Sequence, residues 1–171
     1  MIEEVVLVNT NDEIVGTIEK MEAHQRGLLH RAFSIFLFNN QNELLLQRRA
    51  HYKYRSGGLW TNTCCSHPKL KETVLEAAAR RLMEEMGIQA QMTPSFSFIY
   101  KADFDNGLTE HELDHVLIGK YSGQPNINKD EVAEWKYMPM KAIKTDIESN
   151  PDTYAAWFKI VFDRVHDYIH S

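Results

Sequence analysis

Apolar and polar residues alternate over much of the first third of the chain, which is the pattern of half-buried β-strands. This alternation predicts strands over residues 4–9, 30–39 and 43–49. The polar run Asn-Asn-Gln-Asn at residues 39–42 separates the last two strands and is typical of a hairpin turn. We therefore expect the beginning of the fold to be mostly sheet.

Helical spacing replaces this alternation over residues 73–86. The apolar positions that recur there every three or four residues are Val74, Leu75, Ala78, Leu82 and Met86. Gly87 follows them, at the place where a left-handed residue commonly ends a helix. The pattern predicts one helix in the middle of the chain.

Strand character returns in the second half of the chain, at residues 96–104, 111–121 and 133–138. Residues 105–107, Asp-Asn-Gly, are suited to a turn between the first two of these strands. Helices are expected over residues 139–148 and from Pro151 onward, where Asn150 is a suitable cap. The whole pattern predicts an α/β or α+β sandwich, a mixed β-sheet flanked by helices.

Length and composition narrow the class of protein. A chain of 171 residues buries roughly 70% of its unfolded surface, so we expect one domain over residues 1–171 that acts as a monomer. The net charge of −5 gives no general attraction to nucleic acid or to anionic membranes. The sequence shows neither a signal peptide nor an apolar run of about 18 residues, which predicts a cytoplasmic protein. Cys64 and Cys65 are neighbours, so a disulfide between them would be strained.

Three histidines and two glutamates form a candidate metal site. They are His24, His30, His67, Glu110 and Glu112. Glu110 and Glu112 are two residues apart in a strand-like stretch, so their carboxylates leave the same face of the sheet. Imidazole and carboxylate ligands suit Mn²⁺, Zn²⁺ or Mg²⁺. The alternative is that these are ordinary surface side chains, since the chain holds 8 histidines.

Basic residues form a second candidate site, for an anion such as a small diphosphate. They are Lys20, Arg48, Arg49, Lys53, Arg55, Arg80 and Arg81. Arg48 and Arg49 point to opposite faces of a strand, so at most one of them reaches a buried ligand. The alternative is a solvated face, in which the arginines pair with glutamates along a helix. Beside a phosphate, however, one of those carboxylates would hold Mg²⁺.

The segment from Trp60 to Pro68 places the thiol of Cys65 two residues from the imidazole of His67. Cys65 is two residues before His67, so in an extended segment the two side chains point to the same side. We therefore select Cys65, and not Cys64, as the reactive thiol, and interpret Cys64 as a packing residue. Trp157 follows two alanines on a late predicted helix, where its ring is suited to close a pocket and face a developing cation. For each aromatic residue, core packing is the alternative.

Five segments, taken together, resemble the type 1 isopentenyl-diphosphate isomerases. They are Ala23-His24, His30-Arg31-Ala32-Phe33-Ser34, Gln47-Arg48-Arg49-Ala50, residues 60–68 and Thr109-Glu110-His111-Glu112. These segments occur in order and span almost the entire chain. The resemblance implies a Nudix-like fold and the reversible interconversion of isopentenyl diphosphate with dimethylallyl diphosphate, without flavin.

The resemblance also implies roles for individual residues. The proton-transfer pair would be Cys65 and Glu112, with Tyr100 hydrogen-bonded near Glu112. The ligands of one divalent ion would be His24, His30, His67, Glu110 and Glu112. The substrate contacts would be Lys20, Arg49, Lys53 and Arg81 for the diphosphate, Trp157 for the isoprenoid tail, and Mg²⁺ bridging the diphosphate to Glu85.

Moving a double bond requires that one carbon gains a proton while another loses one. Protonation of an alkene passes through a carbocation-like state, so it needs a strong acid and a site that excludes water. Our hypothesis from the sequence is that Glu112 is the acid toward the alkene and Cys65 the opposing base. The two roles would exchange in the reverse direction.

Residues 66–88 follow the phosphate-binding loop and helix of Nudix hydrolases, with two departures. Ser66 stands where glycine is expected, and Arg81 stands where a metal-binding glutamate is expected. A guanidinium in place of a carboxylate favours holding a diphosphate over activating water to cleave it. The alternatives are a Nudix pyrophosphohydrolase of a small diphosphate or nucleotide, and a non-enzymatic Nudix-like binding module.

Overall fold

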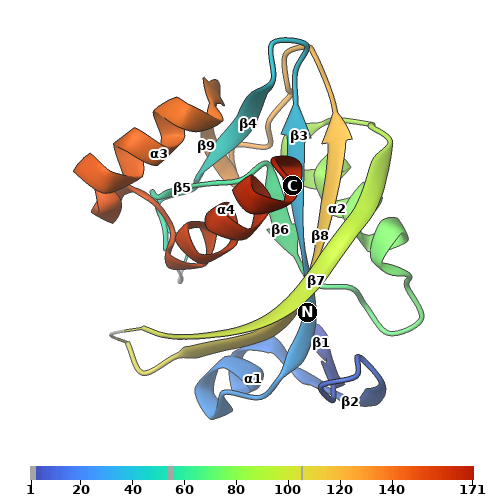
Figure 1. Ribbon diagram of the computed structural model, residues 1–171. Coiled ribbons are helices and arrows are strands. Elements are labelled where there is room, and N and C mark those ends of the chain that lie inside the picture. The colour runs from blue at the N-terminus through green and yellow to red at the C-terminus, as the bar shows by residue number, and fades with distance from the viewer. Residues whose placement is uncertain (1–2, 54–55, 105) are drawn as a thin grey trace.

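The computed structural model describes residues 3–53, 56–104 and 106–171 (Figure 1). The strands are β1 (Glu4–Val8), β2 (Ile14–Glu19), β3 (His30–Phe38), β4 (Glu43–Arg49), β5 (Trp60–Thr61), β6 (Cys64–Ser66), β7 (Met92–Asp103), β8 (Thr109–Lys120) and β9 (Val132–Pro139). The helices are α1 (Lys20–Arg26), α2 (Val74–Met86), α3 (Met140–Ser149), the short 3₁₀ helix η1 (Pro151–Thr153) and α4 (Ala156–Ile169).

Strand β3 lies at the centre of the mixed sheet that these strands form. It runs parallel to β8 and antiparallel to β1, β4 and β6. The register with β8 places His30 opposite Glu112, and the register with β6 places Ser34 opposite Cys65. Residues that are far apart in the sequence therefore meet at one end of β3.

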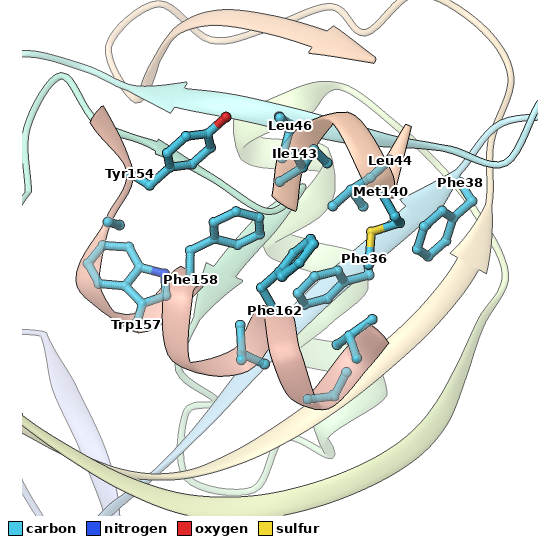
Figure 2. Close-up of a cluster of buried hydrophobic side chains, with 14 of the residues drawn as sticks. Phe36, Phe38, Leu44, Leu46, Met140, Ile143, Tyr154, Trp157, Phe158 and Phe162 are labelled. Carbon is cyan, nitrogen blue, oxygen red and sulfur yellow. The ribbon is translucent and has the colours of Figure 1, made fainter. Parts of the chain in front are cut away.

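Helices cover both faces of this sheet. A cluster of buried side chains on one face joins Phe36 and Leu44 to residues of α3 and α4, among them Ile143 and Phe158 (Figure 2). A second cluster, on the other face, packs strand residues such as Ile35 against α2 (Figure 1). Because both faces are covered, β3 is buried from Ala32 to Phe38 without alternation. The predicted mixed sheet flanked by helices is confirmed.

Helix α2 has the boundaries that its sequence predicts. Thr73 and Glu76 form a capping box at its beginning, which satisfies two backbone N–H groups that the helix leaves unpaired. Gly87 ends it in the left-handed conformation, with φ of 65°. A Cβ atom at Gly87 would lie 2.5 Å from the carbonyl oxygen of Asn126, so only glycine fits there.

The prediction of one helix from Pro151 onward is correct in where helical structure begins and wrong in its continuity. Pro151 opens the short helix η1, and α4 begins only at Ala156. Between them the chain is extended, because Ala155 donates a backbone hydrogen bond of 2.9 Å to Trp60. The amide of Asn150 donates back to Asp146 at 2.9 Å instead of capping the next helix.

Other elements differ from the sequence pattern for local reasons. Strand β7 begins at Met92, not at residue 96, because a register shift beside Pro94 accommodates the proline. Strand β2 and helix α1 were not predicted, since β2 has no alternation of buried and exposed residues. Asp105 of the predicted turn and Arg55 of the basic group lie outside the described residues. In the described part of the chain, no helix is long and apolar enough to cross a membrane.

Candidate functional site

Four of the predicted metal ligands come together at the end of β3. His24 comes from α1, His30 begins β3, His67 follows β6, and Glu112 lies on β8. One ligand atom from each of the four lies within 4.8 Å of the others, and all four side chains are buried. The parallel pairing of His30 with Glu112 explains why residues 82 positions apart share one site.

The hydrogen bonding of His30 tests whether these residues suit a metal ion. Its Nδ1 lies 2.9 Å from the carbonyl oxygen of Leu28, which can only accept, so Nδ1 carries the proton. Nε2 of the same ring lies 3.2 Å from an oxygen of Glu112, where it either donates to the carboxylate or, without that proton, binds a cation. A ligating histidine commonly donates its other N–H to a carbonyl in this way, which leaves Nε2 to face the ion. The residues fit a divalent metal.

The protonation states of the site agree with this fit. Burial lowers the pKa of His67 to about 4 despite the neighbouring Glu112, so the imidazole is neutral and able to ligate. Burial opposes ionisation of Glu112, but hydrogen bonds with His30 and His67 outweigh it and hold its pKa well below the usual range. The site therefore combines the neutral imidazole of His67 with the carboxylate of Glu112.

Tyr100 joins the two glutamates of β8. Its hydroxyl lies 2.5 Å from Glu110 and 2.5 Å from Glu112, so it is shared between both carboxylates. Burial, followed by the charges of Glu110 and Glu112, raises the pKa of Tyr100 well above its ordinary value. Glu110 stands beside the cluster of His24, His30, His67 and Glu112, and its role as a ligand stays a prediction.

The thiol of Cys65 points into a polar and buried surrounding. It donates to the side-chain oxygen of Asn62 at 3.0 Å and approaches the hydroxyl of Ser34 at 3.6 Å. Burial and the neighbouring Asp114 raise the pKa of Cys65 to about 12, so the thiol holds its proton at neutral pH. With Glu112 ionised, these states are the reverse of the acid and base roles expected from the sequence.

A small cavity of about 20 Å³ lies between these groups. Its walls include Cys65, Tyr100, Glu110, Glu112 and Trp157. This volume holds about one water molecule. The predicted catalytic residues and the predicted tail-binding tryptophan therefore surround one small space.

A second cavity, of about 670 Å³, adjoins the first. Cys65, Ser66 and His67 line both cavities, so the two cavities meet at this short segment. The second cavity contains all four predicted diphosphate contacts and Glu85; its basic residues are Lys20, Arg49, Lys53, Lys69, Arg80 and Arg81, and its acidic residues are Glu3, Glu4, Glu84, Glu85 and Glu131. We refer to the first space as the small cavity and to the second as the charged cavity.

Arg81 and Glu85 are in contact in the charged cavity. The Nη2 atom of Arg81 lies 2.5 Å from Glu85 and 2.5 Å from Glu131, while Nη1 donates to Glu84 at 3.0 Å. Burial opposes the charge of Arg81, but Glu85 and Glu131 outweigh it and raise its pKa. At the position where Nudix hydrolases carry a glutamate, this chain therefore carries a cation surrounded by carboxylates.

The remaining basic residues differ in their surroundings. Arg49 is buried, and its guanidinium lies 5.0 Å from the ring centre of Trp157, which links the two cavities. Arg48 points the other way and pairs with Glu134 at 2.9 Å, as expected for neighbours on a strand. Lys20 pairs with Glu3 at 3.4 Å. Arg80 is held by Glu72 at 2.7 Å, in agreement with a role on the helix surface.

Comparison with known proteins identifies the family to which the chain belongs. Residues 28–158 match the NUDIX domain family. An isopentenyl-diphosphate Delta-isomerase from Pectobacterium atrosepticum is 50% identical over 165 residues, which cover 96% of this chain and 92% of that protein. Isopentenyl-diphosphate Delta-isomerase 2 from Aromatoleum aromaticum is 49% identical over 165 residues, covering 96% of this chain and 87% of that protein. The chain belongs to the isopentenyl-diphosphate Delta-isomerase family.

The fold of this isomerase family member also matches distant solved structures. A crystal structure of a Deinococcus radiodurans protein superposes with a TM-score of 0.79 at 20% identity, covering 95% of this chain and 98% of that one. At this identity the likeness concerns the fold alone. The resemblance expected from the five sequence segments is confirmed by the close relatives.

The structure adds residues to the isomerase site that the sequence interpretation missed. Gln47 donates to Glu85 at 2.9 Å, and the buried thiol of Cys64 donates to the same oxygen at 3.4 Å. Cys64 is therefore more than a packing residue. Ser34 donates to the buried Asp114 at 2.7 Å, behind Cys65. The sequence did carry a sign of these contacts. Gln47 and Ser34 are polar residues within apolar strands, and a buried polar side chain needs a hydrogen-bond partner.

Proposed function

We propose that this protein interconverts isopentenyl diphosphate and dimethylallyl diphosphate by adding one proton and removing another. The observation that carries the proposal is the arrangement of the two cavities. A thiol and a carboxylate line the small cavity, which meets at β6 a larger cavity rich in cations. A substrate with a short apolar tail and a diphosphate head fits this division.

The reaction moves a double bond without a net change in atoms. One group adds a proton to the terminal alkene carbon, and the electrons of a neighbouring C–H bond then form the new double bond as a second group accepts that proton. Water would trap the intervening cation as an alcohol. A cavity with room for about one water molecule, lined mostly by buried residues, supports this chemistry.

Cys65 and Glu112 are the proposed proton-transfer pair, because both line the small cavity. In the ligand-free protein the proton resides on the Cys65 sulfur, so direct donation to the alkene begins from the thiol. The assignment expected from the sequence, with Glu112 as the acid, requires that this proton first moves to Glu112. Tyr100 shares its hydroxyl with Glu112 and thereby holds the carboxylate in place.

Trp157 is the proposed wall against the isoprenoid tail. Its side chain is buried, and the residue lines the small cavity. An aromatic face stabilises a desolvated cation by about 2 kcal/mol. The ring therefore supports the carbocation-like state as well as the binding of the tail.

The charged cavity is the proposed site of the diphosphate. Lys20, Arg49, Lys53 and Arg81 supply donors to its oxygens, and Glu85 would hold a Mg²⁺ ion beside them. Mg²⁺ when bound would neutralise part of the charge of the diphosphate. A second ion would be held by His24, His30, His67 and Glu112, with Glu110 adjacent, and would polarise the carboxylate of Glu112. We further propose that the protein acts as a cytoplasmic monomer without flavin, as the sequence predicts.

Proton NMR of isopentenyl diphosphate in heavy water, with purified protein and Mg²⁺, tests the proposal. We expect deuterated dimethylallyl diphosphate to appear without release of phosphate in a parallel assay. Phosphate release without rearrangement would instead support the Nudix pyrophosphohydrolase. Binding without either product, in protein loaded with a divalent metal, would support the non-enzymatic binding module.

A further inference from the structure

Glu131 occupies a particular place in the charged cavity. Its carboxylate lies 3.1 Å from Nζ of Lys53 and 2.5 Å from Nη2 of Arg81. One side chain thus contacts two of the four cations proposed to bind the diphosphate. Glu131 stands directly before β9, in a part of the chain where the sequence showed no motif.

The backbone of Glu131 is held on both sides. Its carbonyl accepts from Ala50 at 3.1 Å, and its N–H donates to Asn128 at 2.9 Å. Asn128 in turn donates to the carbonyl of Glu85 at 2.9 Å, at the end of α2. The carboxylate therefore projects from a point that is fixed to both β4 and α2.

We propose that Glu131 is a positioning residue that holds Lys53 and Arg81 in the arrangement that binds the diphosphate. This inference rests on the proposed function. Lysine and arginine are long side chains that lose much rotamer freedom when they bind a ligand. A carboxylate that restrains both before the ligand arrives removes part of that cost, which is the principle of preorganisation.

Glu131 remains in place when the diphosphate binds, because the cations keep donors for both partners. Glu131 uses one hydrogen of Lys53, whose ammonium group carries three. Arg81 likewise has further N–H groups beyond the one that contacts Glu131. The charged cavity holds six basic and five acidic residues, one net positive charge, which complements a trianionic diphosphate that carries Mg²⁺.

The opposite interpretation makes a different prediction. If Glu131 only occupied the place of the diphosphate, its removal would free two cations and remove one negative charge from an anion site. Glu131→Gln would then bind diphosphate more tightly. A positioning residue requires that the same variant binds more weakly, so the sign of the change decides between the two.

Inorganic pyrophosphate with Mg²⁺ is a suitable probe, because calorimetric titration measures its binding without turnover. We expect Glu131→Gln to weaken this binding by about tenfold, the usual scale of a hydrogen bond between charged groups. Glu134→Gln is the matched control, since Glu134 is exposed on β9 and pairs with Arg48, outside the charged cavity. Unchanged or tighter binding in Glu131→Gln would overturn the proposal.

A double-mutant cycle with Lys53→Met separates positioning from a general loss of structure. Positioning predicts that Glu131→Gln has a smaller effect once Lys53 is gone, and that Glu131→Asp retains part of the affinity. Equal effects in both backgrounds would contradict it. In turnover, KM should rise while kcat changes little. Wild-type protein that binds pyrophosphate but does not isomerise substrate would refute the proposed function and leave the test of Glu131 intact.

Discussion

The two cavities that meet at β6 differ in size and in charge. The small cavity, of about 20 Å³, lies among a thiol, two carboxylates and three aromatic residues, Phe33, Tyr100 and Trp157. The charged cavity, of about 670 Å³, is lined largely by ion-paired lysines, arginines and glutamates. The charged cavity thus already has room for a diphosphate, whereas a five-carbon tail requires the small cavity to expand. Binding energy from the head of the substrate is available to open the site of the chemistry.

This division predicts that variants in the small cavity alter proton transfer and variants among the cations of the charged cavity alter binding. Cys65→Ala removes the proton carrier of the small cavity. We expect kcat to fall by about 10³- to 10⁴-fold, the scale of a lost acid or base, with pyrophosphate affinity within about twofold of wild type. Steady-state kinetics and pyrophosphate titration measure the two quantities. Full turnover in this variant would refute the proposed pair.

Metal binding at the edge of the small cavity should stabilise the fold. Addition of Zn²⁺ or Mn²⁺ at about 100 times its Kd to chelator-treated protein should raise the free energy of unfolding by about 3 kcal/mol, because the ligands converge only in the folded chain. Urea unfolding measures the change. His30→Ala should abolish it, whereas His170→Ala, an exposed residue beyond α4, should not. An equal gain in both variants would place the ion elsewhere.

Neighbouring arginines test whether the charged cavity recognises the head of the substrate. Arg49 is buried in this cavity and lies against Trp157, while Arg48 pairs with Glu134 on the other face. We expect Arg49→Gln to raise KM by about 10- to 100-fold, since it loses charged hydrogen bonds to the diphosphate. Arg48→Gln should change KM by less than about twofold. Similar KM values for the two variants would show that the face of the strand from which the side chain projects does not decide which arginine binds the diphosphate.

The smallest expected effect concerns pH and Glu131. Burial opposes its ionisation, but Lys53 and Arg81 outweigh burial and lower the pKa of Glu131 to about 2, from an ordinary value of 4.5. Because the folded pKa is depressed, the ionised carboxylate stabilises the protein above about pH 4.5, and this contribution is lost as the pH falls toward 2. After allowance for solvent screening, we expect about 1–2 kcal/mol.

Urea unfolding of wild type and Glu131→Gln at several pH values measures this contribution. The difference in free energy of unfolding should be largest near neutral pH and should shrink below about pH 4.5. Glu134→Gln, whose ion pair is exposed, should show a smaller difference at every pH. A constant difference across this range would mean that the charge of Glu131 does not stabilise the fold.

Much of the fold followed from local pattern. Helix α2 was predicted within one residue, because its apolar period, capping threonine and terminal glycine are all local features. The beginning of α4 was not, since a backbone hydrogen bond to Trp60, more than 90 residues earlier, holds Ala155 extended. Strand β2 was also missed, because its residues do not alternate between buried and exposed.

The sequence by itself determined the chemical types of the site: imidazole, thiol, carboxylate and guanidinium groups in segments that resemble one family of isomerases. Only the tertiary structure decided how these groups face one another. The parallel register of β3 and β8 brings His30 to Glu112, and the fixed backbone before β9 brings Glu131 to Lys53 and Arg81. The chemical type of each side chain can be read directly from the sequence. Its protonation and its partners depend on burial and on contacts between distant segments, which arise only when the sheet forms.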